Sequence, residues 1–226
     1  MKKILQLNFL IIIFWCIALS IFLVRFYEHP AIGLLLTPFL TLILIFDYHR
    51  KVGKNQAIYF IFFFCMLGDL MIFNSDFYYF TSGLIAYWGA AILMNFTLNR
   101  ELTEPFSKAI KKPVFYLPFT IYGVYWVIIM VFIKPFLGTL FIPIFIYALT
   151  LSLTCAMSIG VYLHSKSKST LYFAIGLLVL SLTASVMGIN RFYLGSPTLY
   201  AFEILLYAPT LYYINKYFKS KDEDAL

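Results

Sequence analysis

The chain has 226 residues, of which 62% are hydrophobic and 20% aromatic, and its formal net charge is +7. Soluble chains contain roughly 45–50% apolar residues, so this composition excludes a soluble globular domain. The apolar residues form continuous runs rather than alternating ones, which favours transmembrane helices over a membrane β-barrel. We therefore predict an all-α, polytopic membrane protein with one integral membrane domain over residues 1–226.

Eight apolar segments have about the 20 residues that a helix needs to cross a hydrocarbon core roughly 30 Å thick. The second is short, and the sixth is long enough to tilt. The longest loop is expected at residues 99–113, and the tail from residue 219 is expected to be solvated. The eight segments are predicted near residues 4–24, 31–46, 57–73, 77–98, 114–133, 137–163, 171–189 and 198–214.

The basic residues alternate between the two sides of this predicted bundle. Fourteen of the 17 lysine and arginine residues lie at the N-terminus, after even-numbered segments or in the C-terminal tail. The other three, Arg25, Lys134 and Arg191, fall in loops on the opposite side. By the positive-inside rule, both termini are predicted to be cytoplasmic. Lys2 and Lys3 precede a long apolar anchor without an organelle signal, which favours a multi-pass protein of a bacterial plasma membrane.

Several classes of function find no support in the sequence. The positive charge is spread between apolar segments rather than gathered into a nucleic-acid-binding patch. Cys16, Cys65 and Cys155 stand apart inside apolar runs, so neither a disulfide framework nor a metal site is predicted. The common nucleotide-binding and hydrolase motifs are absent. We expect no metal, no organic cofactor, and no nucleic-acid or soluble partner.

One carboxylate, Asp69, lies inside the third apolar segment. A charge that faces lipid there costs at least about 2.5–3.5 kcal/mol, so Asp69 is expected to face the protein interior. Gly68 beside it lets a neighbouring helix approach closely. An ionisable residue at membrane depth marks a functional site by default, and the alternative is a buried carboxyl that only bonds helices together.

A second carboxylate, Glu203, lies in the last segment on the same helix face as Tyr207. At about 1.5 Å of rise per residue, Asp69, Ala184 and Glu203 all lie about 8–9 Å below the same membrane boundary. If the third segment adjoins the last two, Asp69 and Glu203 share one polar cavity. An acid beside a base is what the hydrolysis of an acid-labile bond requires.

The order of several short motifs along the chain suggests a family. These motifs are Thr37–Thr41, the Gly-Asp pair in Leu67–Met71, Phe80–Leu84, Pro143 with Tyr147, Gly176 to Phe192, and Tyr207–Ala208. In this order and spacing the chain resembles the YhhN-like lysoplasmalogenases, a family of eight-helix membrane proteins. The resemblance implies hydrolysis of the vinyl ether of a lysoplasmalogen, which releases a fatty aldehyde and a glycerophospho-base. It also implies an aspartate on the third helix and a Ser-Asp pair on the seventh.

The chain departs from that family's pattern at several site positions. Asp69 matches the family's aspartate on the third helix, but the Ser-Asp pair of the seventh helix falls on Thr183-Ala184. The family's lysine on the second helix falls on Thr37. Its histidine on the fourth helix falls on Ala91, and a nearby tyrosine falls on Met94. The glutamine of the eighth helix is replaced by Pro209, so the resemblance extends to the scaffold more than to the polar site.

Three hypotheses for function follow. The first is a hydrolase for a lysoplasmalogen or a related single-chain lipid, with Asp69 and Glu203 catalytic and Tyr147, Thr183 and Tyr207 in substrate binding. The second is a degenerate family member that binds a membrane lipid, a lysophospholipid or another apolar ligand without hydrolysis. The third is a small transporter with the two carboxylates as a proton relay. It is less favoured, because no Gly- or Pro-broken helix pair recurs in the two halves of the chain.

Overall fold

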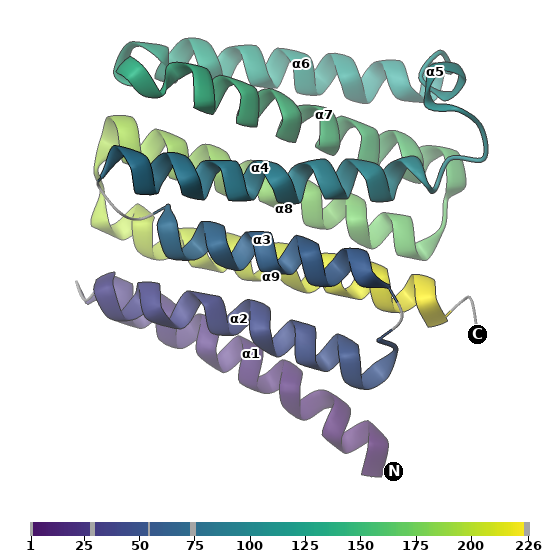
Figure 1. The fold of residues 1–226 in the computed structure, drawn as a ribbon, viewed down its shortest axis with the longest axis horizontal. Helices are drawn as coiled ribbons and strands as arrows, with labels where there is room; N and C mark the ends of the chain where they lie inside the picture. Colours follow the sequence, from purple (N-terminus) through teal and green to yellow (C-terminus); the bar gives the residue numbers. More distant parts are fainter. Residues whose placement is uncertain (1, 28–29, 54, 73–75, 224–226) are drawn as a thin grey trace.

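The computed structural model describes residues 2–27, 30–53, 55–72 and 76–223, which contain nine α-helices and no strand (Figure 1). A short helix, α5 (Phe106–Ala109), lies in the connection between α4 and α6. Two 3₁₀ turns at residues 134–136 and 138–140 precede α7, and a π-helical turn at residues 190–194 follows α8. The long helices are α1 (Lys2–Phe26), α2 (Pro30–Lys51), α3 (Gln56–Met71), α4 (Phe77–Asn99), α6 (Pro113–Ile133), α7 (Phe141–Ser165), α8 (Lys168–Ile189) and α9 (Pro197–Glu223).

Each predicted apolar segment falls on one long helix, which confirms the all-α fold class. Some predicted boundaries are wrong. α2 continues to Lys51 rather than residue 46, and α9 continues to Glu223 rather than residue 214, because residues beyond each apolar run are also buried in the bundle, among them Tyr48 of α2 and Tyr217 of α9. The loop predicted at residues 99–113 contains α5. Phe73, the predicted end of the third segment, lies outside the described residues.

Six of the described helical stretches are long and apolar enough to cross a membrane, which makes the chain a multi-pass membrane protein. α3 is strongly apolar but has only 16 residues. α9 has 27 residues and includes charged residues at its C-terminal end. The six candidate spans are Phe9–Phe26, Ile32–Lys51, Phe77–Asn99, Pro113–Phe136, Gly138–Ser165 and Lys168–Leu194.

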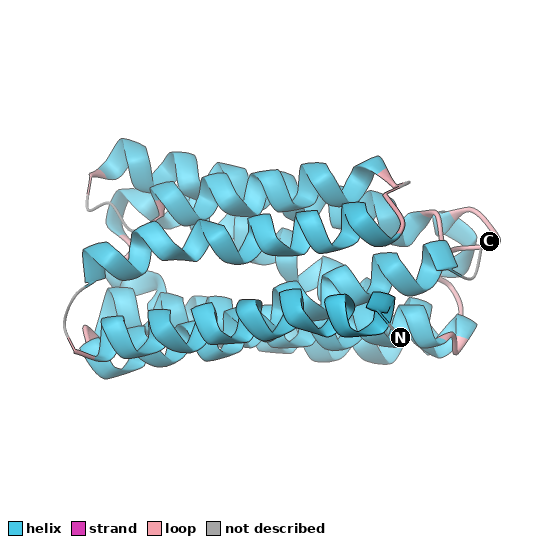
Figure 2. Cartoon of the chain, turned by 90° about the horizontal axis from the view of Figure 1, so that it is seen from below, coloured by secondary structure: helices cyan, strands magenta, loops and turns pink. Residues whose placement is uncertain are grey.

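The long helices run side by side in two layers, and both chain ends lie at the same end of the bundle (Figures 1 and 2). α1, α2, α3, α4, α7, α8 and α9 form a closed circuit in which each helix packs against the next and α9 packs against α1. α6 lies outside this circuit and packs mainly against α7. The first and last helices are therefore neighbours, and the bundle is complete only when α9 is in place.

The C-terminal end of α9 is tied to α2 by a buried ion pair. Asp47 of α2 is 1% exposed and pairs with Lys219 of α9 and with Lys51, whose Nζ lies 3.3 Å from the carboxylate. Lys221 and Tyr217 both bond to Glu101, which follows α4. The expectation that the tail from residue 219 is solvated is therefore wrong at Lys219, because the buried carboxylate of Asp47 holds a cation there.

We expect Asp47→Ala to destabilise the protein by about 3 kcal/mol, because it leaves the largely buried Lys219 ammonium without a counter-charge. The measurement is the midpoint of thermal unfolding in detergent. Glu104→Ala is the matched control, since Glu104 pairs with the exposed Lys112 and exposed pairs contribute only about 0–1 kcal/mol. Equal losses of stability in the two variants would contradict the role given to Asp47.

α3 and α4 meet closely at Gly83. A Cβ added to Gly83 would lie 2.7 Å from the backbone nitrogen of Ile72, which has no freedom to move aside. We expect Gly83→Ala to lower the stability of the protein by about 1–3 kcal/mol through this overpacking. Gly123→Ala on α6 is the control, because a Cβ there meets no atom within 4 Å. Both effects are measured by thermal unfolding, and an unchanged midpoint for Gly83→Ala would refute the close contact.

Candidate functional site

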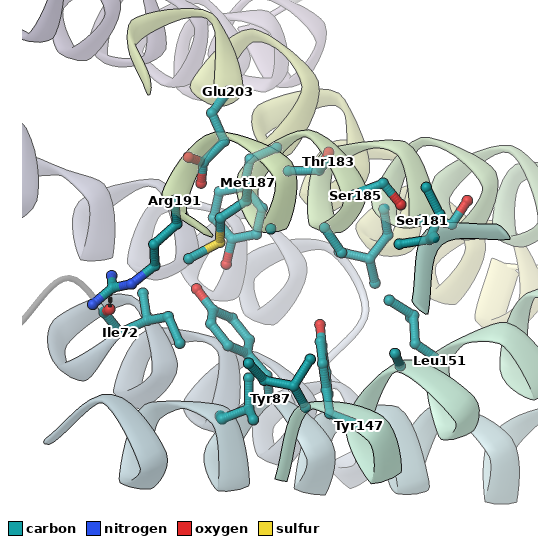
Figure 3. A pocket seen from close by; sticks show the side chains of 18 of the residues that line it. Ile72, Tyr87, Tyr147, Leu151, Ser181, Thr183, Ser185, Met187, Arg191 and Glu203 are labelled. Atoms are coloured by element: carbon teal, nitrogen blue, oxygen red, sulfur yellow. Dashed lines mark hydrogen bonds between the residues drawn. The ribbon is translucent and has the colours of Figure 1, made fainter. Parts of the chain in front are cut away.

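A cavity of about 120 Å³ lies among the long helices (Figure 3). Arg25 at the end of α1 and Ile72 just after α3 line it, and both helices end on the side of the bundle away from the chain ends (Figure 1). Every long helix contributes to its wall, and most of the wall is apolar. The structure brings the five site residues singled out in the sequence to this one cavity. They are Asp69 of α3, Tyr147 of α7, Thr183 of α8, and Glu203 and Tyr207 of α9.

The carboxyl group of Asp69 is held by two tyrosine hydroxyls. Asp69 is 1% exposed, as its cost in the membrane requires. Tyr87 of α4 donates a hydrogen bond to Oδ1, and Tyr207 of α9 donates one to Oδ2 at 3.1 Å. The ring of Tyr87 packs directly on Gly68, where a Cβ would lie 2.8 Å from ring carbons. Asp69 therefore joins α3 to its neighbour α4 and, across the bundle, to α9.

Glu203 presents the second carboxyl to the same cavity (Figure 3). It is 7% exposed and lies one helix turn before Tyr207 on α9. The described residues give this carboxyl no hydrogen bond, in contrast to the two that Asp69 accepts. The two carboxyl groups thus share a cavity but have different surroundings.

Arg25 is a cavity residue, although the sequence suggested a loop. It lies at the end of α1, is 2% exposed and lines the cavity. Its guanidinium donates to the hydroxyl of Thr37 at 3.0 Å and to the carbonyl of Tyr200 at 3.4 Å, and it lies 4.5 Å from the centre of the Tyr200 ring. Arg25 is therefore held rigidly between α1, α2 and α9.

Arg191 is the second cation of the cavity, and it too was expected in a loop. It lies in the π-helical turn after α8, where its guanidinium donates to the carbonyl of Ile72 at 2.7 Å and lies 4.2 Å from the centre of the Phe80 ring. Two arginines accompany two carboxyls in one cavity. Buried carboxylates need nearby positive charge, which explains why these two arginines turn inward.

Tyr147 and Thr183 differ in how their hydroxyls are used. The hydroxyl of Tyr147 points into the cavity beside Tyr87 (Figure 3), and no described residue forms a hydrogen bond with it. The hydroxyl of Thr183 donates to the carbonyl of Val179 in its own helix at 2.8 Å. Ala184, which stands where the resemblance places a second aspartate, also lines the cavity. That position faces the site but offers only a methyl group.

Two other positions that depart from the family pattern lie outside this cavity. Ala91 and Met94 line a separate void of about 10 Å³, and Tyr87, Tyr147 and Tyr207 border both spaces. The three tyrosines therefore form a floor between the main cavity and the void. The apolar replacements lie beneath that floor, away from Glu203.

The sequence reasoning missed Tyr87, Arg25 and Arg191. The register of the α3–α4 hairpin could have found Tyr87, because Gly83 packs against Ile72 and the same antiparallel register brings Tyr87 to the level of Asp69. The arginines could have been found from charge, since both stand at the end of the bundle where the two membrane carboxylates lie.

Among the described residues, no group of three or more His, Cys, Asp or Glu side chains could hold a metal ion.

Together these features define a multi-pass, all-α membrane protein with two carboxyls and two arginines around an apolar cavity. The chain belongs to the YhhN family, whose model matches residues 24–217. This range contains every residue that lines the cavity. No curated protein and no solved structure is significantly similar to the chain.

We expect Tyr87→Phe to lower the stability of the protein by about 1–3 kcal/mol, because it leaves a buried oxygen of Asp69 without a donor. Tyr147→Phe is the matched control, because it removes a hydroxyl at the same cavity that makes no hydrogen bond to a described residue. Thermal unfolding in detergent compares the two variants. Equal midpoints would show that the Tyr87 hydroxyl contributes nothing to holding Asp69.

Proposed function

We propose that all eight long helices cross the membrane and that both chain ends are cytoplasmic. α3 has 16 residues and spans about 24 Å at 1.5 Å per residue, a length that local thinning of the bilayer accommodates. Both chain ends lie at one end of the bundle (Figure 1), and most of the basic residues belong to loops at that end. The cavity then lies in the outer half of the membrane, in a bacterial plasma membrane.

We further propose that the protein hydrolyses the vinyl ether of a lysoplasmalogen or of a closely related single-chain lipid. The YhhN family includes lysoplasmalogenases, and the chain belongs to it. The observation that carries the proposal is that Asp69 and Glu203 line one apolar cavity in different surroundings. Two carboxyls with different environments can take the separate roles of acid and base.

The different surroundings suggest which carboxyl takes which role. Glu203, without a hydrogen-bond donor among the described residues, carries the proton and gives it to the alkenyl carbon of the vinyl ether. The resulting oxocarbenium ion is attacked by water, whose proton passes to Asp69, already oriented by Tyr87 and Tyr207. In the collapse of the hemiacetal, Asp69 gives its proton to the glycerol oxygen and Glu203 takes the proton of the hemiacetal hydroxyl. The products are a fatty aldehyde and the free glycerol hydroxyl, and both carboxyls return to their starting states. Tyr147 supports the substrate from the floor of the cavity.

A second function, lipid binding without hydrolysis, is favoured by the residues of α8. Ala184 lines the cavity where the resemblance expects a second aspartate, and the Thr183 hydroxyl is turned to its own helix. An apolar cavity that keeps its shape but lacks that carboxylate would still bind a membrane lipid or lysophospholipid. The two functions differ in whether an aldehyde is released.

The test uses the purified full-length protein in lipid nanodiscs with a lysoplasmalogen. We expect release of a fatty aldehyde, measured by trapping it with a hydrazine. Asp69→Asn and Glu203→Gln should each lower the rate by about 10²-fold or more, the usual size of a general acid or base contribution. Glu104→Gln, which changes a carboxylate in the loop after α4, should leave the rate unchanged.

One outcome would decide against hydrolysis, and another against the role given to Asp69. Saturable binding of the lysoplasmalogen without aldehyde from the wild type would establish the second function instead. Aldehyde release that is unaffected by Asp69→Asn would remove Asp69 from catalysis.

A further inference from the structure

The cavity is too small for the lipid that the proposed function places in it. Its volume is about 120 Å³, whereas pockets that enclose a drug-sized ligand have about 300–1,000 Å³. A long alkyl chain therefore has to leave the cavity. The route to consider lies between α6 and α8, because α6 packs much less closely against α8 than against α7.

α6 and α8 run parallel and are joined by a few side-chain contacts. The hydroxyl of Tyr122 lies 3.4 Å from that of Ser181, and the hydroxyl of Tyr125 bonds to that of Ser185. These pairs are 59 and 60 residues apart in the sequence, so the two helices keep a constant register. Towards the end of α6, the rings of Phe132 and Tyr193 meet with centroids 5.1 Å apart.

Between these contacts, no hydrogen bond or ring contact joins the described residues of α6 and α8, and we call this stretch the window. On α6 it extends from Tyr125 to Phe132, which is about 10 Å at 1.5 Å per residue. In this register Gly188 of α8 lies one or two residues from the level of Ile129, and both residues line the cavity and are half-buried. A Cβ added to Gly188 would meet no atom within 4 Å, so space is open at this level of the wall.

We propose that the single alkyl chain of a membrane amphiphile passes from the cavity to the lipid through this window, beside Ile129 and Gly188. The inference rests on the proposed function, because it takes the polar end of the same lipid to be near Glu203. Trp126 of α6 lines the cavity and packs against Phe145 of α7, and no described residue accepts a hydrogen bond from its buried indole N–H. An ether or glycerol oxygen of the lipid supplies that acceptor. The rest of the wall is apolar and suits the chain.

The first experiment maps the path of the chain with two photoreactive probes, in the full-length protein in nanodiscs. Both are single-chain alkyl ether lysophosphocholines. One carries a diazirine next to the ether oxygen, and the other carries it at the end of the chain. We expect peptide mass spectrometry to find the first probe on cavity residues and the second on the lipid-facing flanks of α6 and α8.

The two probes separate failure of this inference from failure of the proposed function. Labelling of the cavity by the first probe, with the second on α1, α2 or α3, would overturn the window and leave the proposed function standing. If the first probe does not label the cavity, the proposed function fails and the window fails with it.

The second experiment blocks the window. We expect Gly188→Trp to fill the open space and to lower labelling of the cavity by the first probe about tenfold. Gly123→Trp is the matched control, because Gly123 lies on the exposed face of α6 and also has open space around it. Labelling of Gly188→Trp at the wild-type level, with a normal thermal unfolding midpoint, would refute the window.

Discussion

The burial of one carboxyl group, that of Asp69, is the constraint on which the site depends. A carboxylate among hydrocarbon is costly unless protein groups replace the water that it loses. Here hydroxyls from α4 and α9 replace that water, through Tyr87 and Tyr207. Holding Asp69 therefore fixes three helices relative to one another. The cavity is the space that remains above the floor formed by these two tyrosines and Tyr147, and the cations of Arg25 and Arg191 complete it.

Much of the fold could be predicted from the sequence, because membrane helices can be recognised in it as continuous apolar runs. Asp69 and Glu203 could be found because a charge inside such a run is costly wherever it occurs. Tyr87 could not be found in the same way, since periodicity shows which face of a helix is polar but not which helix it meets. Arg25 was missed because of its place at the end of an apolar run. A cation at the end of an apolar run looks like a loop residue until its partners on other helices are known.

The comparison with the family pattern separates the scaffold from the polar groups it carries. The position expected to hold a lysine, Thr37, accepts a hydrogen bond from Arg25, so a positive charge reaches this point from α1 instead of α2. The position expected to hold the second aspartate, Ala184, has no such substitute in its own helix, and Glu203 provides a carboxyl from α9. The cavity of this chain thus contains two carboxyls and two arginines, although these two positions hold a threonine and an alanine.

The closure of the bundle between α1 and α9 has a consequence for how the protein is made. Helices enter the membrane in order of synthesis, and Tyr87 follows Asp69 by only 18 residues, within one hairpin. Tyr207 follows Asp69 by 138 residues, and Glu203 arrives on the same last helix. The early hairpin can therefore enter the bilayer with its carboxyl already bonded once. The cavity is complete only when α9 is in place, so a chain that stops before α9 contains most of the helices but lacks Glu203, Tyr207 and part of the cavity wall.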